Sequence, residues 1–277
     1  MADCEPSAHR FMDLTDPEYA YMFGFLQADG HLCQGEGQKG KLTVELNIRD
    51  VDLLYRFKYL TPYNSSVTER VRSTNFTESC HSATWSLCSL DARTKLNQLG
   101  LPYGRKSTTI APPPVPFSRR DYLRGLIDAD GSVGYTGPGL PFISLATASA
   151  AIGSFLRAYA QAITGVERLT QRNSRDEIYN ISYEKEAAQQ LAADLYYPGC
   201  LSLGRKQVKA DSFSRWVRPV DMRIVNPRRA WSAHEDQMVL EACDIVAVAT
   251  KLGRTEKSCR LRRWRLRNSR MLMPNDQ

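Results

Sequence analysis

The chain has 277 residues, of which 42% are hydrophobic and 24% are charged, with 37 Lys and Arg against 30 Asp and Glu. This apolar fraction is enough to build folded cores, which excludes disorder over most of the chain. No apolar run approaches the roughly 20 residues that span a bilayer, and the polar N-terminus does not resemble a signal peptide, so we expect neither. Seven scattered cysteines without a CxxC pair indicate a reducing, intracellular compartment and argue against structural zinc.

The net charge of +7 is unevenly distributed along the chain. Residues 219–277 carry 12 basic and 7 acidic side chains, so most of the excess lies in this last stretch. Within 251–270 there are nine basic residues and one acid, Glu256. Such a density of positive charge predicts a polyanionic partner, with a solvated charged tail as the alternative.

Two parts of the sequence repeat at an offset of about 100 residues. Met-Phe-Gly-Phe-Leu-Gln-Ala-Asp-Gly at 22–30 returns as Leu-Arg-Gly-Leu-Ile-Asp-Ala-Asp-Gly at 123–131, and Gly-Arg-Lys at 104–106 returns at 204–206. We therefore predict two copies of one domain-sized unit, residues 1–110 and 117–215. A stiff, Pro-rich linker at 111–116 joins them.

The first copy should open with a helix that Asp16 caps and that ends at Gly30 in a left-handed conformation. Residues 41–49 alternate between apolar and polar, which predicts a half-buried strand, and a helix follows from Asp50 through Phe57. Further strands are expected near 66–72 and 83–89, with a helix near 91–99.

The second copy should repeat this order. Its first helix would run from a Ser118–Asp121 capping box to a left-handed Gly131. Strands are expected near 142–147, 166–172 and 177–183, and a helix near 185–195. Each unit is then α-β-β-α-β-β-α, an α+β arrangement with an antiparallel sheet.

Asp29 and Asp130 end the two repeated helices, where the helix dipole disfavours an anion. Small residues precede both aspartates at i, i+4 spacing, so the two helices can pack closely and bring the carboxylates together; they are Ala20, Gly24 and Ala28, and Gly125 and Ala129. Two close carboxylates repel unless a cation compensates, and hard oxygen ligands suit Mg²⁺. Such a site serves phosphodiester hydrolysis, whereas a plain helix stop is the alternative for either copy alone.

The motif at 123–131 resembles that of the LAGLIDADG homing endonucleases, from which it differs at one position, and 22–30 is a looser copy. The resemblance covers about 15–215, as the single-chain, two-motif type. It implies that the motif helices form a central interface between two pseudo-symmetric repeats whose antiparallel sheets make a saddle over DNA. It also implies that Asp29 and Asp130 bind Mg²⁺, or another divalent cation such as Mn²⁺, with the carbonyls of Ala28 and Ala129 as further ligands.

One position departs from this pattern, because Gln27 occupies the place that Asp128 has in the second copy. The family's principal metal ligand lies elsewhere, so the mismatch is compatible with asymmetric cleavage.

The resemblance also implies a basic residue near the scissile phosphate, for which Lys106 and Lys206 are the catalytic candidates. Phosphate anchoring outside the active centre is the alternative. The sequence does not separate these lysines from Arg105 and Arg205.

Polar strand faces read the major groove in this family, which implies a set of DNA contacts here. In the first copy they are Lys41, Thr43, Asn47, Arg49, Arg70 and Arg72, and in the second Arg168, Thr170 and Arg172. A solvated strand face is the alternative for any one of them.

After a linker at 216–230, residues 231–270 are predicted to form a small all-α, helix-turn-helix domain. A Ser232–Glu235 capping box begins the first helix. Asp244 starts the second, Ile245–Leu252, and Gly253 ends it, and Glu256–Arg267 form the third. Trp-Ser-x-x-Glu-Asp at 231–236 and Leu-Gly-Arg-Thr at 252–255 resemble Myb/SANT-type domains.

In the third of these helices we expect Cys259 and Leu266 inside and Trp264 at the rim or against DNA. The predicted DNA contacts are Arg254, Lys257, Arg260, Arg263 and Arg267. A basic helix that docks on the rest of the chain is the alternative.

Together these features predict a monomeric, metal-dependent, site-specific endonuclease that hydrolyses both strands of duplex DNA at a long pseudo-palindromic target, as in intron homing. No membrane and no small-molecule substrate are expected. Such an enzyme would work in the cytoplasm of a bacterial or phage-infected cell, or in an organelle. The alternatives are a non-cleaving transcriptional regulator with the same domains, which would lack the motif acids, and an intron maturase that binds RNA.

Overall fold

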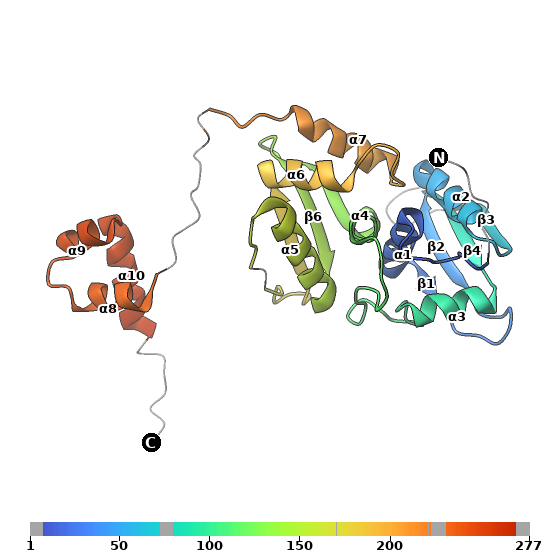
Figure 1. Ribbon diagram of the computed structural model, residues 1–277, viewed down its shortest axis with the longest axis horizontal. Coiled ribbons are helices and arrows are strands. Elements are labelled where there is room, and N and C mark those ends of the chain that lie inside the picture. The colour runs from blue at the N-terminus through green and yellow to red at the C-terminus, as the bar shows by residue number, and fades with distance from the viewer. Residues whose placement is uncertain (1–7, 73–79, 170, 221, 223–230, 270–277) are drawn as a thin grey trace, which may run out of the picture. The chain divides into compact units, whose positions relative to one another are not determined.

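The computed structural model describes residues 8–72, 80–169, 171–220, 222 and 231–269 (Figure 1). By its internal contacts the chain divides into two compact units, 1–218 and 219–277. None of the helices in the described ranges combines the length and the apolar character that crossing a membrane requires.

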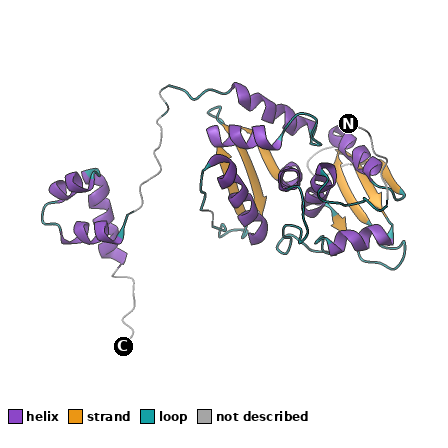
Figure 2. Ribbon diagram, viewed as in Figure 1, coloured by secondary structure: helices purple, strands orange, loops and turns teal. Residues whose placement is uncertain are grey.

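The first half of the larger unit is a four-stranded antiparallel sheet with three helices (Figures 1 and 2). Its elements are α1 (Pro17–Asp29), β1 (His31–Leu32), β2 (Leu42–Asn47), the 3-10 turn η1 (Ile48–Asp50), α2 (Val51–Leu60), β3 (Ser65–Arg72), β4 (Cys80–Leu87) and α3 (Leu90–Gln98). The strand order is β1-β2-β4-β3. This half confirms the predicted α-β-β-α-β-β-α unit, with β1 as the strand that the sequence had left unplaced.

The second half repeats the order with one strand fewer among its described residues. Its elements are α4 (Arg119–Asp130), β5 (Gly131–Tyr135), β6 (Pro141–Thr147), α5 (Ala150–Thr164), β7 (Tyr179–Glu184), α6 (Glu186–Leu195), α7 (Gly204–Ser212) and the 3-10 turn η2 (Phe213–Arg215). The sheet order is β5-β6-β7, and both pairs are antiparallel. The fold class is therefore α+β with antiparallel sheets.

The strand predicted near 166–172 is wrong for the described residues of that segment, which form no regular structure. Gly165 ends α5 in the left-handed region (φ +69°), and Leu169 is 89% exposed. A strand on this edge would need an apolar side to bury, and only Val166 is partly covered. The chain instead turns at 174–176 before β7 begins.

The ends of the two motif helices are partly as predicted. Asp16 caps α1 by accepting a hydrogen bond from the Glu18 amide at 2.9 Å. The capping box at Ser118 is wrong, because its hydroxyl donates to the Asp121 carboxylate at 2.5 Å instead of accepting from the backbone. Gly30 and Gly131 do end the helices but are extended, not left-handed, because the chain enters β1 and β5 directly.

One hydrophobic core extends through both halves of the larger unit. Figure 1 shows α1 and α4 between the two sheets, and both contribute fully buried side chains to that core. The two halves are therefore fused through their motif helices.

The smaller unit contains three helices, α8 (Ala233–Glu241), α9 (Ile245–Leu252) and α10 (Glu256–Ser269). The Ser232–Glu235 capping box is present, Asp244 caps α9 and left-handed Gly253 ends it, as predicted. A small core holds the three helices together, formed by Val239, Ile245, Ala249, Leu252 and Cys259. Leu266 is partly covered while Trp264 is 62% exposed, which confirms the predicted inner face of α10.

Candidate active site

The two motif helices approach each other at glycine. A Cβ added to Gly125 would lie 2.8 Å from the Phe25 amide nitrogen and nearer still to the Tyr21 carbonyl oxygen. A Cβ on Gly24 would likewise overlap the backbone of Tyr122. Real Cβ contacts of this kind essentially never occur, so only glycine allows the backbones this close. The predicted packing through small residues is confirmed at these two positions.

Further contacts join the two helices, and the charges at their ends give their relative direction. Tyr21, early in α1, donates to the Asp128 carboxylate near the end of α4 at 2.8 Å. Its repeat counterpart Tyr122, early in α4, donates to Gln27 near the end of α1 at 2.5 Å. Lys106, which binds carbonyls at the C-terminus of α1, also interacts with Asp130, and Lys206, at the C-terminus of α4, interacts with Asp29. Both C-termini, with Asp29 and Asp130, therefore lie at one end of the pair.

Both carboxylates are unusual for helix-end aspartates. Each residue is exposed on one side, yet desolvation by the surrounding protein raises the pKa of both groups. The charge of Asp29 raises the pKa of Asp130 further, whereas Lys106 and Lys206 lower the pKa of both. Two acids and two bases from different parts of the chain therefore share one electrostatic site.

The ammonium groups of the two lysines donate hydrogen bonds to backbone carbonyls at the C-terminal ends of the motif helices. Lys206 Nζ donates to the carbonyls of Ile127 and Asp128 at 2.7 Å and to that of Gly131 at 2.8 Å. Because an ammonium has three protons, each of these bonds uses one of them. A cation here also satisfies orphan carbonyls and offsets the negative end of the helix dipole.

Lys106 does the same for α1. Its ammonium donates to the carbonyls of Leu26 at 3.2 Å and Gln27 at 2.5 Å, and to that of Ala28. Burial lowers the pKa of Lys106 and of Lys206 to about 8, against the opposing pull of the nearby carboxylates. The predicted lysines thus reach the site, but their protons are directed at the helix ends.

The Arg and Lys of the second Gly-Arg-Lys have different partners. Arg205 forms an ion pair with Asp50 of the first repeat at 3.1 Å. Lys206 is 4% exposed, beside the carboxylates.

Gln27 and Asp128, the mismatched pair, lie inside the protein and not at the carboxylate pair. Asp128 accepts hydrogen bonds from the Leu203 amide and the Tyr196 hydroxyl at 2.7 Å, as well as from Tyr21. Leu203 is the N-cap of α7, which carries Lys206. Burial raises the pKa of Asp128, although these hydrogen bonds oppose the shift.

Gln27 performs the equivalent task with the opposite hydrogen-bonding role. Its amide nitrogen donates to the carbonyls of Gly100 at 2.7 Å and Ala111 at 3.1 Å, on either side of Lys106 in the chain. An aspartate could not donate to two carbonyls, so the difference between the repeats follows from the groups that each side chain must satisfy.

The first sheet presents a polar face to solvent, with several predicted DNA contacts on it. Register places Thr43 beside Ser86, Asn47 beside Ser82, and Arg70 on the far side of Ser82. Lys41, Asn47, Arg49 and Arg70 are exposed, and Arg72 pairs with Glu45 at 3.0 Å. This face therefore carries net positive charge.

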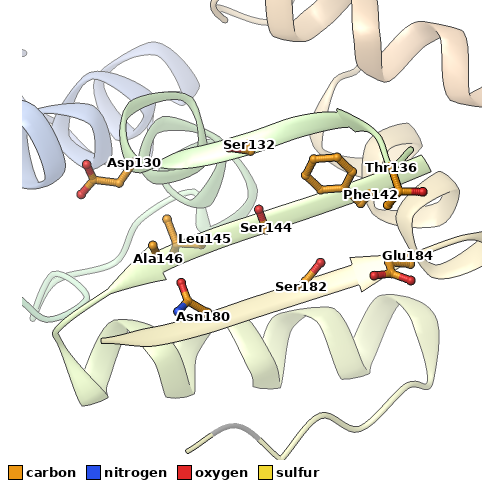
Figure 3. Close-up of a pocket in the computed structure, with 10 residues that line it drawn as sticks. All are labelled: Asp130, Ser132, Thr136, Phe142, Ser144, Leu145, Ala146, Asn180, Ser182 and Glu184. Atoms are coloured by element: carbon orange, nitrogen blue, oxygen red, sulfur yellow. The ribbon is translucent and has the colours of Figure 1, made fainter. Parts of the chain in front are cut away.

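The second sheet has a polar groove of about 380 Å³ next to Asp130 (Figure 3). Ser132, Ser144 and Ser182 form one row across its three strands. No lysine or arginine lines this groove, which is formed by Asp130, Ser132, Thr136, Phe142, Ser144, Leu145, Ala146, Asn180, Ser182 and Glu184. The alternation of side chains along 142–147 and 177–183 could have identified Ser144, Asn180 and Ser182 as residues of the polar face, but the sequence prediction favoured cations.

The cations predicted for this half lie off the sheet. Arg172 donates to the Ala148 carbonyl at 2.9 Å, and Arg168 lies over the Tyr183 ring at 5.9 Å. Both are exposed, whereas Thr170 lies outside the described residues. The two sheets therefore present different chemistry. The first is cationic, whereas the second has a row of uncharged polar side chains with the carboxylates of Asp130 and Glu184 in the same groove.

The oxygen-rich end of the helix pair fits a hard divalent cation. Asp29 and Asp130 offer carboxylate oxygens whose raised pKa values a cation would lower, and Ala28 and Ala129 precede them in the helices. In the described parts of the chain, no group of three or more His, Cys, Asp or Glu residues is arranged so that it could hold a metal ion. The carboxylate pair would thus need carbonyl, water or phosphate oxygens to complete a coordination shell.

In the smaller unit, several predicted contact residues serve the fold. Arg254 forms a largely buried ion pair with Glu235 at 2.9 Å and lies over the Trp231 ring at 4.0 Å. Arg263 donates to the Ala242 carbonyl at 2.9 Å. Lys257, Arg260 and Arg267 remain exposed on α10.

Comparisons with known proteins support the resemblance in the second repeat. Residues 118–195, from the N-cap of α4 through α6, match the family model of the LAGLIDADG-like domain. No protein of curated function matches the sequence. The motif resemblance is thereby confirmed for this stretch, which carries a LAGLIDADG-like domain.

Several solved structures are similar at low identity. The homing endonuclease I-WcaI bound to its DNA recognition sequence has 13% identity and a TM-score of 0.47, covering 71% of this chain and 87% of that one. The meganuclease I-SmaMI bound to uncleavable DNA has 12% identity and a TM-score of 0.47, covering 76% and 89%. The N-terminal LAGLIDADG domain of DUF199/WhiA has 11% identity and a TM-score of 0.40, also covering 76% and 89%.

Proposed function

We propose that this protein is a metal-dependent, site-specific endonuclease that cuts both strands of duplex DNA. The observation that carries the proposal is the pair of aspartates, Asp29 and Asp130, at the common end of two helices packed through glycine. Neither carboxylate serves its helix, because the dipole disfavours an anion there and burial raises the pKa of both. Both repeats thus place a carboxylate where its ionisation is unfavourable for the fold. A catalytic or metal-binding role of the two carboxylates best explains this arrangement.

Asp29 and Asp130 would hold Mg²⁺ or a similar cation, with the carbonyls of Ala28 and Ala129 as further ligands. When bound, such a cation supplies an activated water and stabilises charge on the phosphate oxygens. Lys106 and Lys206 act as positioning groups in this proposal, because all their protons point at the motif helices. Their charges also lower the pKa of both carboxylates, which opposes the effect of burial.

DNA would lie across the polar faces of the two sheets, with the cationic first sheet contacting phosphates and the serines and Asn180 of the second sheet contacting base edges. The smaller unit would extend the target through α10, in the manner of a helix-turn-helix reader. A single chain already contains both aspartates, so we propose that the enzyme acts as a monomer.

A randomised duplex pool tests this proposal directly. The full chain is incubated with the pool and Mg²⁺, and both new DNA ends are sequenced. We expect cuts on both strands at one defined sequence, and none with EDTA or with the Asp29→Asn/Asp130→Asn double variant. Enrichment of a sequence without cutting would instead identify a non-cleaving DNA binder, and preferential enrichment of RNA from a matched pool would identify a maturase.

A further inference from the structure

Helix α10 has an exposed face with an apolar centre. Leu261 is 47% exposed and Trp264 is 62% exposed, although both are large hydrophobic side chains. Together with Lys257 they are spaced i, i+4, i+7, which places all three on one side of the helix. Single exposed hydrophobic residues are ordinary, but two on one face of a 14-residue helix form a small patch.

The opposite side of α10 is anchored to the other two helices, which fixes this face outward within the unit. Cys259 is fully buried in the small core. Arg262 forms a two-bond ion pair with Asp236 of α8, at 2.6 and 2.7 Å. Arg263 donates to the carbonyl of Ala242, which follows α8. Rotation of α10 to hide Leu261 and Trp264 would break all of these interactions.

Positive charge borders the apolar centre on both sides. Helical spacing puts Arg260 and Arg267 along one edge and Arg265 along the other, and all three are exposed. Glu256 is the one acid in α10, and it is already paired with Arg260 at 2.6 Å. The face therefore complements a polyanion that also offers a small apolar group.

We infer that Leu261 and Trp264 contact thymine methyl groups in the major groove of duplex DNA. Among the major-groove edges of the four bases, thymine alone presents a methyl group, and apolar side chains recognise it by contact. The bordering arginines would lie against the phosphates on either side. This inference rests on the proposed function, since it specifies which bases α10 reads within a DNA target.

A membrane surface fits these observations less well. Helices that bind in the plane of a bilayer bury a long apolar face. The outward face of α10 offers only two large apolar side chains, and the remainder of that face is charged. A patch this small matches individual methyl groups in a groove.

Replacement of thymine by uracil tests the inference, because deoxyuridine lacks only the methyl group. The full chain, in EDTA so that no DNA is cut, is titrated against a duplex enriched from a randomised pool. Each dT in turn is replaced by dU, and Kd is measured by fluorescence anisotropy. We expect Kd to rise about fourfold at one or two positions, as for one buried methyl group.

Variants then assign the effect to α10. In Leu261→Ala or Trp264→Ala the penalty for uracil should disappear at one of these positions. Val246→Ala, which shortens an exposed apolar side chain of α9, should retain it. Both substitutions in α10 are at exposed positions, so circular dichroism should show an unchanged fold.

Three outcomes would overturn the inference while leaving the proposed function intact. One is tight duplex binding in which every dT→dU change alters Kd less than 1.5-fold. Another is a penalty for uracil that persists in both alanine variants. If Leu261→Ala abolished binding to vesicles containing phosphatidylserine but left DNA affinity unchanged, the face would be a membrane contact and the inference would be wrong. Absence of any duplex binding would instead refute the proposed function itself.

Discussion

Substitution of Gly125 by alanine should separate the motif helices. The added Cβ would lie 2.8 Å from the Phe25 amide nitrogen, whereas ordinary contacts begin near 3.4 Å, and it would overlap the Tyr21 carbonyl even more closely. Both obstacles are backbone, so no rotamer change relieves them, and α1 and α4 must move apart. Overpacking of this kind costs about 1–3 kcal/mol. For a unit of this size each kcal/mol lowers Tm by roughly 2–4 °C.

Thermal unfolding followed by circular dichroism measures this effect, with Gly134→Ala as the matched control. At Gly134 the nearest atom to an added Cβ is the Phe142 ring at 3.6 Å, an ordinary contact. We expect Gly125→Ala to lower Tm by about 2–12 °C and Gly134→Ala to change it little. A displacement of about 1 Å at the aspartates should also slow cleavage roughly 100-fold. A Gly125→Ala protein that melts and cuts like the control would refute the close-packing argument.

Three further predictions concern the charges. Lys206→Met should destabilise the fold by about 2 kcal/mol or more in denaturant titrations, because three carbonyls lose a charged donor, whereas Lys209→Met on the exposed side of α7 should not. Arg70→Gln/Arg72→Gln should reduce the slope of log affinity for DNA against log salt by up to about 2. Asp130→Asn should raise Tm at neutral pH without divalent cation, because burial and Asp29 raise the pKa of Asp130 in the fold.

The sign of the last prediction follows from proton binding. The unfolded chain loses the Asp130 proton near the ordinary pKa of 3.8, whereas the folded chain keeps it to higher pH. Above that value ionisation favours unfolding, and the gain from asparagine should shrink as pH falls toward 3.8. An Asp130→Asn protein that melts below wild type at neutral pH would contradict this reasoning. Equal stability of Lys206→Met and Lys209→Met would contradict the prediction for Lys206. An unchanged slope of log affinity against log salt in Arg70→Gln/Arg72→Gln would contradict the prediction for the first sheet.

Much of the helix packing could be predicted from sequence because its signals are local. Small residues at i, i+4 before each aspartate predicted the close helix pair, and Gly24 and Gly125 are the points of contact. The caps of the smaller unit followed from single residues such as Ser232 and Asp244. These features depend on neighbours within a few positions, which the sequence displays directly.

The geometry of the site could not be predicted from local sequence, because it depends on residues that lie far apart in the chain. Lys206 reaches carbonyls 75–79 positions away, so only the tertiary fold shows that its protons are occupied. The role of Gln27 depends in the same way on carbonyls at Gly100 and Ala111. Similarly, Arg254 was predicted as a DNA contact because its partner, Glu235, lies 19 positions earlier, on α8.

The conformations of Gly30 and Gly131 show another limit of prediction from the sequence. A glycine after a helix most often ends it in the left-handed region, but here a strand begins at once and pulls the residue into extended backbone. At Gly131 an added Cβ would meet the Ser144 carbonyl at 2.5 Å, so glycine is needed for close approach to β6. Strand pairing decided the geometry, and that pairing is not visible at the motif.

Strand-resolved cleavage by single aspartate variants tests the central claim most directly. A duplex carrying the enriched target, labelled differently on its two strands, is cut under single-turnover conditions with Mg²⁺. Wild type, Asp29→Asn, Asp130→Asn and the exposed control Asp176→Asn are compared. We predict that Asp176→Asn cuts both strands at the wild-type rate, whereas each of the other variants slows at least one strand 100-fold or more. Wild-type rates on both strands in Asp29→Asn or Asp130→Asn would contradict the assignment of catalysis to the paired carboxylates.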